Sequence, residues 1–567
     1  MKNEALSEYE RWLSNVPKDD FWRGELEALA HDEPRRTDAF YRDLAFGTGG
    51  LRAEIGAGSN RMNHYVVGRA TQGLANYIKK IYPGEKLKAC VAYDTRRCSK
   101  EFAEHSARIL SAGGVQVYLF AGARPTPMLS FAIRHFGAHT GIVITASHNP
   151  RQYNGYKAYN ATGGQLTDEA AGAVLEEINA LDVFDLEAGG ERQEAGEIVL
   201  LDEAFDEIYF QAIEPYMLRK DLSRAHGGDL KLLYSPLHGT GLVPVTGILE
   251  RLGYGNVTVV PSQKYQDEAH SFPSVKKPNP EEVEVFAPAL EIAGTLKPDV
   301  IFATDPDADR IGVLAQDAAG EYIPLTGTQL GALLTDYLIQ SHIEAGGLPP
   351  SPAIVTTIVT GTLAGRVCAA NGVHVELVLT GFKYIGERMD QWKADGSHTF
   401  LFGFEESYGY LTGDACRDKD AVISCALVAE MALDCKRRGM TLIGALEALY
   451  EKYGAVSEDV YNKEAKGAAG MAQIAAWMAG IRRGAELPGE TILAMEDYAA
   501  GIHGLPPADV LKLYLADGSW LVVRPSGTEP KIKLYVCTDK AFAPGTPIEK
   551  AQARCAEILE KAKSFFG

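Results

Sequence analysis

Three observations predict that this chain is an α/β protein that ends in a smaller α+β domain. The chain has 567 residues, which is too long for one hydrophobic core and indicates roughly three to five domains. Apolar runs typical of strands alternate with helix-like segments in three successive rounds, as in parallel sheets covered by helices. The final stretch contains instead a hairpin signal and a closing amphipathic helix.

The three rounds have the same order of elements and end in polar loops. The first has helices at 7–13 and 21–30, a glycine-rich loop at 46–52, a strand at 87–93, a helix at 100–111, a strand at 115–120, a helix after Pro127 and a strand at 141–144. The second has a strand at 230–234, a helix ending at Leu252, a strand at 257–260, a helix at 281–293 and a strand at 299–303. The third has a helix at 329–340, a strand at 353–359, a helix at 363–370, a strand at 373–379, a helix at 384–392 and a strand at 399–402. In open α/β sheets ligands bind beyond the carboxyl ends of strands, so the loops that follow these strands are candidate sites.

The last stretch has a different order of elements. Strands at 511–515 and 520–523 flank Asp517-Gly518-Ser519, which is a hairpin turn signal, and a strand at 532–537 and a helix at 548–565 follow. We therefore expect domains at 1–204, 205–321, 322–454 and 455–567.

Composition excludes several classes of function. The formal net charge of −19 argues against a nucleic-acid partner and against an anionic membrane surface, but not against a small anionic substrate. The eight cysteines form no CxxC pair and lack zinc spacing, which favours reduced thiols and a cytoplasmic location. We expect no signal peptide and no membrane-spanning segment. The oligomeric state cannot be inferred from these features.

The loop Thr145-Ala146-Ser147-His148-Asn149-Pro150 follows the strand at 141–144. A serine at the carboxyl end of a buried strand, beside a histidine and ten residues before Lys157, is placed for nucleophilic work. A simple polar turn that ends in Asn-Pro explains this segment alone equally well. Three further polar loops favour the nucleophile.

Asp305, Asp307 and Asp309 alternate directly after the strand at 299–303. Alternation at a strand end can bring three carboxylates around one point, where they repel one another unless a cation neutralises them. Oxygen ligands select Mg²⁺ or a similar ion, and the adjacent Arg310 can bind an anion. The alternative is a solvated acidic turn. A calcium loop is disfavoured, because the glycine and the terminal glutamate of an EF-hand are missing.

The loop that begins at Arg524 has the composition of a phosphate-binding loop. It offers a guanidinium, the hydroxyls of Ser526 and Thr528, and backbone N–H groups at Gly527. Lys533 on the next strand adds positive charge. A Pro-Gly turn is the simpler alternative.

The segment Gly403-Phe404-Glu405-Glu406-Ser407 places two acids and a hydroxyl at a strand end, where they could bind a sugar. A helix N-terminus explains this segment alone equally well. Lys157, Lys383 and Lys419 each follow one of the loops or strands. They are candidates for phosphate binding or proton transfer, although surface lysines are common.

Together these loops resemble the α-D-phosphohexomutase superfamily, most closely its long bacterial α-phosphoglucomutase or phosphopentomutase-like type. The matching motifs are FGTGGLR at 46–52, TASHNP at 145–150, SPLHGTG at 235–241, DPDADR at 305–310, GFEES at 403–407, CRDKD at 416–420 and RPSGTEP at 524–530. They occur in the family's order over nearly the whole chain. The resemblance implies three similar α/β domains with mixed, largely parallel sheets and a smaller α+β C-terminal domain, all around a central cleft.

The resemblance also implies roles for individual residues. Ser147 would carry the phosphoryl group and, with the three aspartates of the 305–310 loop, hold Mg²⁺. His148, Lys157 and Lys419 would be the candidates for proton transfer, and the sequence does not choose among them. The implied substrate-binding residues are Arg52, Arg310, Thr380, Gly381, Lys383, Glu405, Ser407, Arg524, Ser526, Gly527, Thr528 and Lys533.

The implied reaction interconverts glucose 1-phosphate and glucose 6-phosphate. Phospho-Ser147 would give its phosphoryl group to the sugar phosphate, with glucose 1,6-bisphosphate as intermediate and activator. Phosphopentomutase and phosphomannomutase reactions use the same mechanism and remain alternatives, with Ser407 favouring a hexose. A non-catalytic sugar-phosphate-binding protein would need no nucleophile, and a metal-dependent phosphatase would need the aspartates without Ser147.

Overall fold

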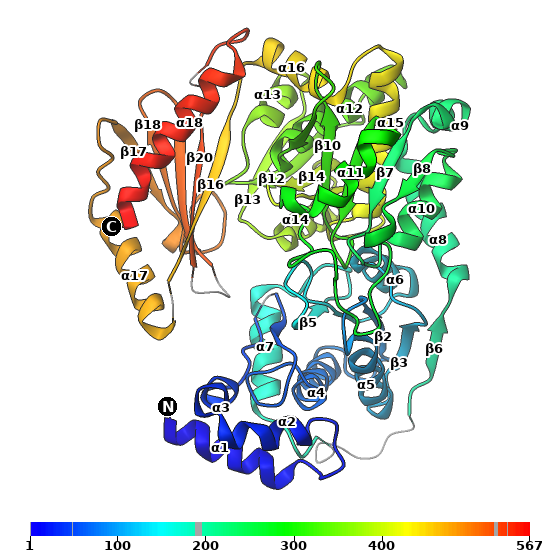
Figure 1. Ribbon diagram of the computed structural model, residues 1–567, viewed down its shortest axis with the longest axis vertical. Helices are drawn as coiled ribbons and strands as arrows, with labels where there is room; N and C mark the ends of the chain where they lie inside the picture. Colours follow the sequence, from blue (N-terminus) through cyan, green and yellow to red (C-terminus); the bar gives the residue numbers. More distant parts are fainter. Residues whose placement is uncertain are drawn as a thin grey trace. The chain divides into compact units, whose positions relative to one another are not determined.

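The structure of the protein, a computed structural model, describes residues 2–47, 49–186, 195–465, 467–526, 531–540 and 542–566. The chain forms two compact units. The first unit contains residues 1–314, 386–391 and 409–433, and the second unit contains residues 315–385, 392–408 and 434–567. Figure 1 shows the helices and β-sheets, coloured along the chain from blue to red.

The first sheet contains the strand that leads to Ser147. Its order is β1-β5-β4-β2-β3-β6. The bounds are β1 Leu51–Glu54, β2 Lys88–Tyr93, β3 Gln116–Phe120, β4 Thr140–Ile144, β5 Tyr153–Tyr159 and β6 Ile198–Leu201. Strand β2 is parallel to β3 and β4, and β3 is parallel to β6, whereas β5 is antiparallel to β4 and β1. The sheet is therefore mixed but largely parallel, which confirms the predicted fold class.

Helices lie on both faces of this sheet. They are α4 (His64–Ile81), α5 (Ser99–Ala112), α6 (Thr126–Phe136) and α7 (Asp168–Asn179). The chain passes from β2 to β3 and then back across β2 to β4, so right-handed crossovers place α5 and α6 on opposite faces. Helix α4 packs against α5 and α7.

The N-terminal helices extend the core of the first unit. They are α1 (Lys2–Asn15), α2 (Arg23–Ala28) and α3 (Glu33–Phe40). The Trp12 ring is fully buried and meets the Phe40 ring edge-on, with the centroids 5.8 Å apart. These helices confirm the predicted helical start of the chain, and the second helix is shorter than the predicted 21–30.

The second sheet presents the aspartate loop. Its order is β11-β10-β9-β7-β8, with bounds β7 Leu232–Ser235, β8 Val257–Val259, β9 Val300–Thr304, β10 Ile311–Gln316 and β11 Tyr322–Leu325. Strand β7 is parallel to both β8 and β9. The accompanying helices are α8 (Glu203–Ile213), α9 (Lys220–His226), α10 (Leu242–Arg251) and α11 (Ala287–Leu296).

The helix predicted at 281–293 begins later than expected. A 3₁₀ turn at Val283–Phe286 comes first, and α11 begins at Ala287. Pro288 explains the boundary, because proline is favoured in the first turn of a helix, where its missing N–H has no partner to lose.

The third sheet contains the strand that ends at Glu405. Its order is β13-β12-β14-β15, with bounds β12 Pro352–Thr357, β13 His374–Val378, β14 Thr399–Glu405 and β15 Gly409–Thr412. Strand β12 is parallel to β13 and β14. The helices that follow in this part of the chain are α12 (Gly327–Glu344), α13 (Leu363–Ala370), α14 (Phe382–Asp395), α15 (Ala421–Arg437) and α16 (Leu442–Tyr453).

The fourth sheet is fully antiparallel and confirms the α+β end of the chain. Its order is β16-β20-β19-β18-β17, with bounds β16 Glu458–Glu464, β17 Ile492–Asp497, β18 Leu511–Leu515, β19 Trp520–Pro525 and β20 Lys531–Cys537. Helices α17 (Gly467–Arg483) and α18 (Ile548–Ala562) share its core. The predicted hairpin joins β18 to β19, and Gly518 takes the positive φ of 87° that the turn requires.

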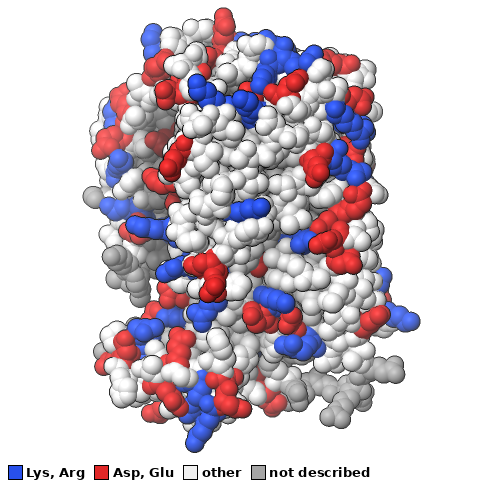
Figure 2. Space-filling model, turned by 45° about the vertical axis from the view of Figure 1, so that its right-hand side comes forward, with Lys and Arg blue, Asp and Glu red and all other residues white. Residues whose placement is uncertain are grey.

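Charges of both signs are distributed over the surface. Figure 2 shows acidic and basic side chains interspersed on the visible face, with uncharged surface between them. The excess of acidic residues is therefore not gathered in one patch on this face. Among the described residues, no helix is both long and apolar enough to span a membrane.

Candidate active site

Ser147 lies three residues beyond the end of β4, and only 3% of the residue is exposed. Its hydroxyl donates a hydrogen bond of 2.8 Å to Oδ2 of Asp305. Its backbone φ is +52°, a left-handed conformation that non-glycine residues rarely adopt. The strand end therefore aims the serine oxygen at the aspartate loop, in a conformation that the surroundings must hold.

His148 is the nearest nitrogen base in sequence. Its Nδ1 lies 3.3 Å from Oγ of Ser147. Burial, together with the positive charges of Arg310 and Arg52, lowers the pKa of His148 well below its usual range. The imidazole is therefore neutral at physiological pH.

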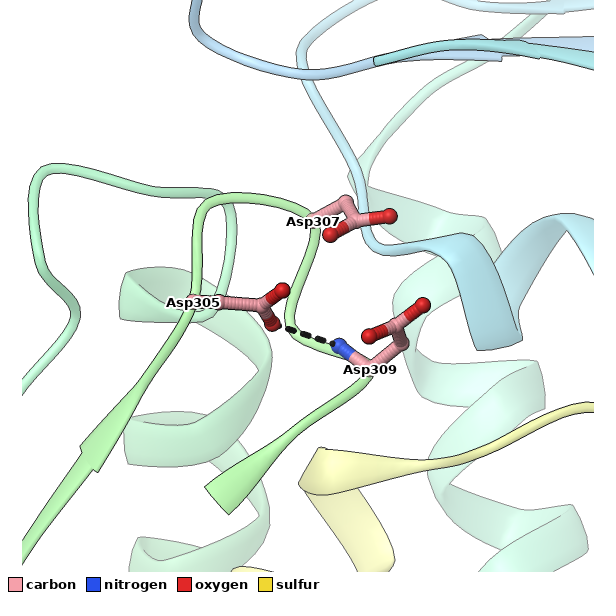
Figure 3. A group of neighbouring side chains, drawn as sticks. All are labelled: Asp305, Asp307 and Asp309. Atoms are coloured by element: carbon pink, nitrogen blue, oxygen red, sulfur yellow. Dashed lines mark hydrogen bonds between the residues drawn. The ribbon is translucent and has the colours of Figure 1, made fainter. Parts of the chain in front are cut away.

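The three aspartates converge after β9, as Figure 3 shows. One carboxylate oxygen from each lies within 4.8 Å of the others, and all three residues are buried. The backbone N–H groups of Asp309 and Arg310 each donate to Oδ1 of Asp305 over 3.1 Å. Ala308 turns the loop with a φ of +46°. The loop thus gathers carboxylates that would repel one another in the absence of positive charge.

The carboxylate oxygens of this cluster fit a cation. Burial and the neighbouring Asp307 and Asp309 raise the pKa of Asp305 well above its usual range. Oδ1 of Asp307 and Oδ1 of Asp309 are buried and accept no hydrogen bond from the residues that the structure describes. Buried acceptors are normally satisfied, so these oxygens fit the ligand set of a hard metal ion, as the sequence predicts.

Lys157 enters the cluster from β5. Lys157 pairs with Val143 across the antiparallel strands β4 and β5. The lysine therefore lies beside the carboxyl end of β4, although it follows Ser147 by ten residues. Its Nζ lies 2.7 Å from Oδ2 of Asp307 and 3.2 Å from Oδ2 of Asp309. Burial alone would lower the pKa of Lys157, but these two carboxylates raise it overall, so the side chain is a cation.

Lys419 approaches the same carboxylates from the CRDKD segment. Its Nζ lies 3.2 Å from Oδ2 of Asp309 and 3.1 Å from Oδ1 of Asp418. Oδ2 of Asp418 accepts a hydrogen bond of 2.8 Å from the Tyr159 hydroxyl. The two lysines therefore provide positive charge from two separate segments.

Two arginines that the sequence singled out lie beside the serine and aspartate loops. Nη1 of Arg52, in β1, donates to Oδ1 of Asn149 over 3.2 Å. The guanidinium of Arg310 forms an ion pair with Glu281. Both arginines belong to the first unit, together with Ser147.

Two residues that support the aspartate loop were missed by sequence reasoning. Thr126, the first residue of α6, donates through its backbone N–H to the carbonyl of Asp307 over 3.0 Å and through its hydroxyl to Oδ2 over 2.8 Å. Thr240 donates to the carbonyl of Pro306 through both its N–H, over 2.8 Å, and its hydroxyl, over 2.9 Å. Thr240 lies in the SPLHGTG motif, to which the sequence analysis gave no function. Thr126 lies in no motif, and its only sequence signal is the predicted start of a helix.

In the second unit, Glu405 ends β14 and is buried. Its Oε1 accepts a hydrogen bond of 2.7 Å from the N–H of Gly381, which has a φ of +128°. The hydroxyl of Thr380 is buried and has no hydrogen-bond partner among the described residues. Ser407 follows Glu405 in the turn before β15, and the Lys383 ammonium lies 4.7 Å from the centre of the Tyr384 ring. A buried carboxylate beside an unpartnered hydroxyl can bind a polyol.

The C-terminal basic loop is described in part. Arg524 in β19 pairs with Lys533 in β20, so both cationic residues lie at the end of the strand pair that holds the loop. The N–H of Ser526 donates to the carbonyl of Lys531 over 2.8 Å and closes the base of the loop. Gly527 and Thr528 lie outside the described residues.

Comparisons with known proteins match the whole domain series. Models of the phosphoglucomutase/phosphomannomutase domains match residues 43–183 (α/β/α domain I), 207–320 (domain II), 326–453 (domain III) and 464–541 (C-terminal domain). A phosphoglucomutase of Staphylococcus haemolyticus is 36% identical over 88% of this chain and 90% of its own length.

Solved structures show the same fold. A putative phosphomannomutase from Thermus thermophilus has a TM-score of 0.67 at 24% identity, covering 92% of this chain and 99% of its own. The open form of the Paramecium pp63/parafusin phosphoglucomutase has a TM-score of 0.68 at 18% identity, covering 93% of this chain and 96% of its own. At these identities the likeness concerns the fold alone.

Proposed function

The chain belongs to the phosphoglucomutase/phosphomannomutase family, and we propose on this basis that it interconverts glucose 1-phosphate and glucose 6-phosphate through phospho-Ser147. The observation that carries the proposal is the 2.8 Å hydrogen bond from the buried Ser147 hydroxyl to Asp305, inside a cluster of three carboxylates and two lysines. A binding protein has no need of a buried nucleophile in this setting.

In the proposed reaction the bond between Oγ of Ser147 and phosphorus breaks while a bond forms between phosphorus and a sugar hydroxyl oxygen. The sugar hydroxyl loses its proton to a base, and Oγ of Ser147 takes up a proton as it leaves phosphorus. The neutral imidazole of His148, with Nδ1 3.3 Å from Oγ, supports a role in this proton exchange. Reversal of these steps with the other phosphate of glucose 1,6-bisphosphate returns the phosphoryl group to Ser147. Such transfers depend on positioning and on neutralised charge more than on covalent chemistry.

Lys157 and Lys419 supply fixed positive charge beside the reacting phosphate. The raised pKa of Lys157 favours the protonated side chain, which can act as a cation or donate a proton but cannot act as a base. Asp305, Asp307 and Asp309 would hold Mg²⁺ together with an oxygen of the phosphoserine. The metal ion would act as a Lewis acid that neutralises charge on the phosphoryl oxygens.

The second unit would provide substrate recognition. We assign sugar hydroxyls to Glu405 and Ser407, with Thr380, Gly381 and Lys383 beside them. The buried carboxylate of Glu405 and the unpartnered hydroxyl of Thr380 support this assignment. The proposed phosphate-binding groups are Arg524, Ser526, Gly527, Thr528 and Lys533, with Arg52 and Arg310 as further substrate contacts.

A side-by-side assay of glucose 1-phosphate, mannose 1-phosphate and ribose 1-phosphate tests the substrate. We expect the highest kcat/KM with glucose 1-phosphate, because the relative that matches 88% of this chain is a phosphoglucomutase. Faster turnover of mannose 1-phosphate or ribose 1-phosphate would reassign the substrate while retaining the mechanism. No turnover of any of the three would contradict the proposed function.

A further inference from the structure

One buried arginine holds the loop of Ser147 by its main chain. Nη2 of Arg96 donates to the carbonyls of Ser147 and Asn149, the latter over 2.6 Å. Nη1 donates to the carbonyls of Pro150, over 2.9 Å, and Tyr153, over 3.1 Å. The side chain of Arg96 has no exposed surface. A single guanidinium therefore binds four carbonyls across seven residues of the loop.

Asp94 completes the arrangement on the other side of the serine. Its Oδ2 lies 3.1 Å from Nε of Arg96 and accepts a hydrogen bond of 2.7 Å from the Thr145 hydroxyl. Oγ1 of Thr145 accepts in turn a hydrogen bond of 2.8 Å from the N–H of Ser147. Arg96 therefore holds the carbonyl of Ser147. Asp94 holds the N–H of Ser147 indirectly, through the Thr145 hydroxyl.

The contacts from Arg96 and Thr145 restrain the main chain of Ser147, which has an unfavourable conformation. The φ of Ser147 is +52°, and a non-glycine residue in this region costs free energy that the surrounding structure must supply. The same conformation aims the hydroxyl at Asp305. Phe272 packs on the arginine, with the guanidinium carbon 5.0 Å from the ring centre, and leaves it little freedom to move.

We propose that Arg96 and Asp94 are positioning residues for phosphoryl transfer, holding the main chain of Ser147 so that its oxygen stays aimed at the reacting phosphate. The inference rests on the proposed role of Ser147 as phosphoryl carrier. Neither residue is assigned a contact with substrate. Their effect is expected on the chemical step and not on the binding of sugar phosphate.

Arg96→Lys tests the geometry separately from the charge. Lysine keeps the positive charge but has one ammonium, which cannot reproduce the planar fork that reaches four carbonyls. We expect kcat to fall about 100-fold, the loss typical of a misplacement of about 1 Å. KM for glucose 1-phosphate should change less than about threefold, because sugar-phosphate binding is kept.

Variants of Thr145 provide a second test of the proposal. Thr145→Val removes the hydroxyl that links Asp94 to the N–H of Ser147, whereas Thr145→Ser keeps it. The valine variant should lose kcat as Arg96→Lys does, and the serine variant should recover most of it. Single-turnover transfer from the phosphorylated enzyme to glucose 1-phosphate reports the chemical step directly.

Matched controls separate positioning from stability. Arg23 also binds two main-chain carbonyls, those of Leu13 and Val16 over 2.7 and 2.8 Å, so Arg23→Lys reports the general cost of such a change. Thr71→Val removes another buried hydroxyl, which donates to the carbonyl of Val67 over 2.8 Å. Both controls should keep kcat even where the melting temperature falls.

Three results decide the proposal. A slowed single-turnover transfer in Arg96→Lys and Thr145→Val, at melting temperatures matched by the controls, supports it. An unchanged transfer rate, or an equal loss in the controls, overturns it. If Ser147→Ala retains full turnover, the proposed role of Ser147 itself is wrong, and this outcome is recognised before the other variants are measured.

Discussion

Lys157 and Asp307 form a buried ion pair across two parts of the first unit. Nζ of Lys157, in the antiparallel strand β5, lies 2.7 Å from Oδ2 of Asp307 in the loop after β9. Asp307 also accepts a hydrogen bond from the Thr126 hydroxyl. Burial alone would raise the pKa of Asp307, but Lys157, together with the hydrogen bonds from Asp305 and Thr126, lowers it overall. The carboxylate is therefore ionised, and within the described part of the chain its Oδ1 accepts no hydrogen bond, as a metal ligand would require.

Replacing Asp307 by asparagine is expected to slow phosphoryl transfer. Asp307→Asn removes one negative ligand and the partner of Lys157, so kcat should fall roughly 10²–10³-fold while binding of sugar phosphate is largely kept. The Mg²⁺ concentration for half-maximal activity should rise. Asp317→Asn, in the turn after β10, is the matched control. Full activity of the wild type after chelation would show that the metal assignment is wrong.

Ser147→Ala is expected to abolish mutase turnover, with a loss of roughly 10⁴-fold or more, because the variant lacks the oxygen that is proposed to carry the phosphoryl group. Intact-mass measurement should find a phosphate on the wild type that is missing from the variant. The melting temperature should stay close to that of the wild type. Substantial residual turnover would identify another carrier.

Arg524→Ala is expected to raise KM for glucose 1-phosphate roughly ten- to a hundredfold. A charged hydrogen bond to an anion contributes about 1.5–3 kcal/mol, and we expect it to act on the phosphate that is not transferred. Arg482→Ala is the control, since Arg482 forms ion pairs with Asp497 and Asp509 in the same domain. An unchanged KM with a collapsed kcat would assign the loop to the chemical step.

Glu405→Gln is expected to depress the forward and reverse reactions to a similar degree. A mutase must bind its sugar in two orientations that exchange the phosphates, so one set of hydroxyl contacts serves both. The variant should also discriminate less between glucose and ribose phosphates, because a buried carboxylate is costly to leave unpaired. Glu376→Gln, on β13, is the control. A loss in one direction only would show that Glu405 reads one orientation.

The free energy of unfolding of the second unit is expected to depend on pH through Glu458. Burial raises its pKa to about 7 from 4.5, although a hydrogen bond from the Thr326 hydroxyl favours the ionised form. Between these two values the folded chain binds more protons than the unfolded chain, so the free energy of unfolding falls as pH rises through this window. Glu458→Gln should remove this fall, which a pH series of melting temperatures measures. A parallel pH profile in the variant would contradict the assignment.

The sequence alone determined which loops matter. Ser147, Asp305 and Glu405 were all found from short apolar runs that end in polar residues, because strand periodicity and strand ends are local properties of the chain. The alternation of α and β segments likewise predicted three sheets with parallel strands and a hairpin at Gly518. The metal-binding potential of the aspartates followed from three acids at alternate positions.

The side chains that surround those loops are brought there by the tertiary fold. Lys157 reaches Asp307 because β5 pairs antiparallel with β4, and Thr126 reaches it because α6 begins beside the loop after β9. Arg96 was invisible as a support of Ser147, since its four carbonyl partners lie more than fifty positions along the chain. Contacts of this kind, and the pKa values that burial imposes on Asp305 and His148, depend on distances through space that neighbouring residues in the sequence do not encode.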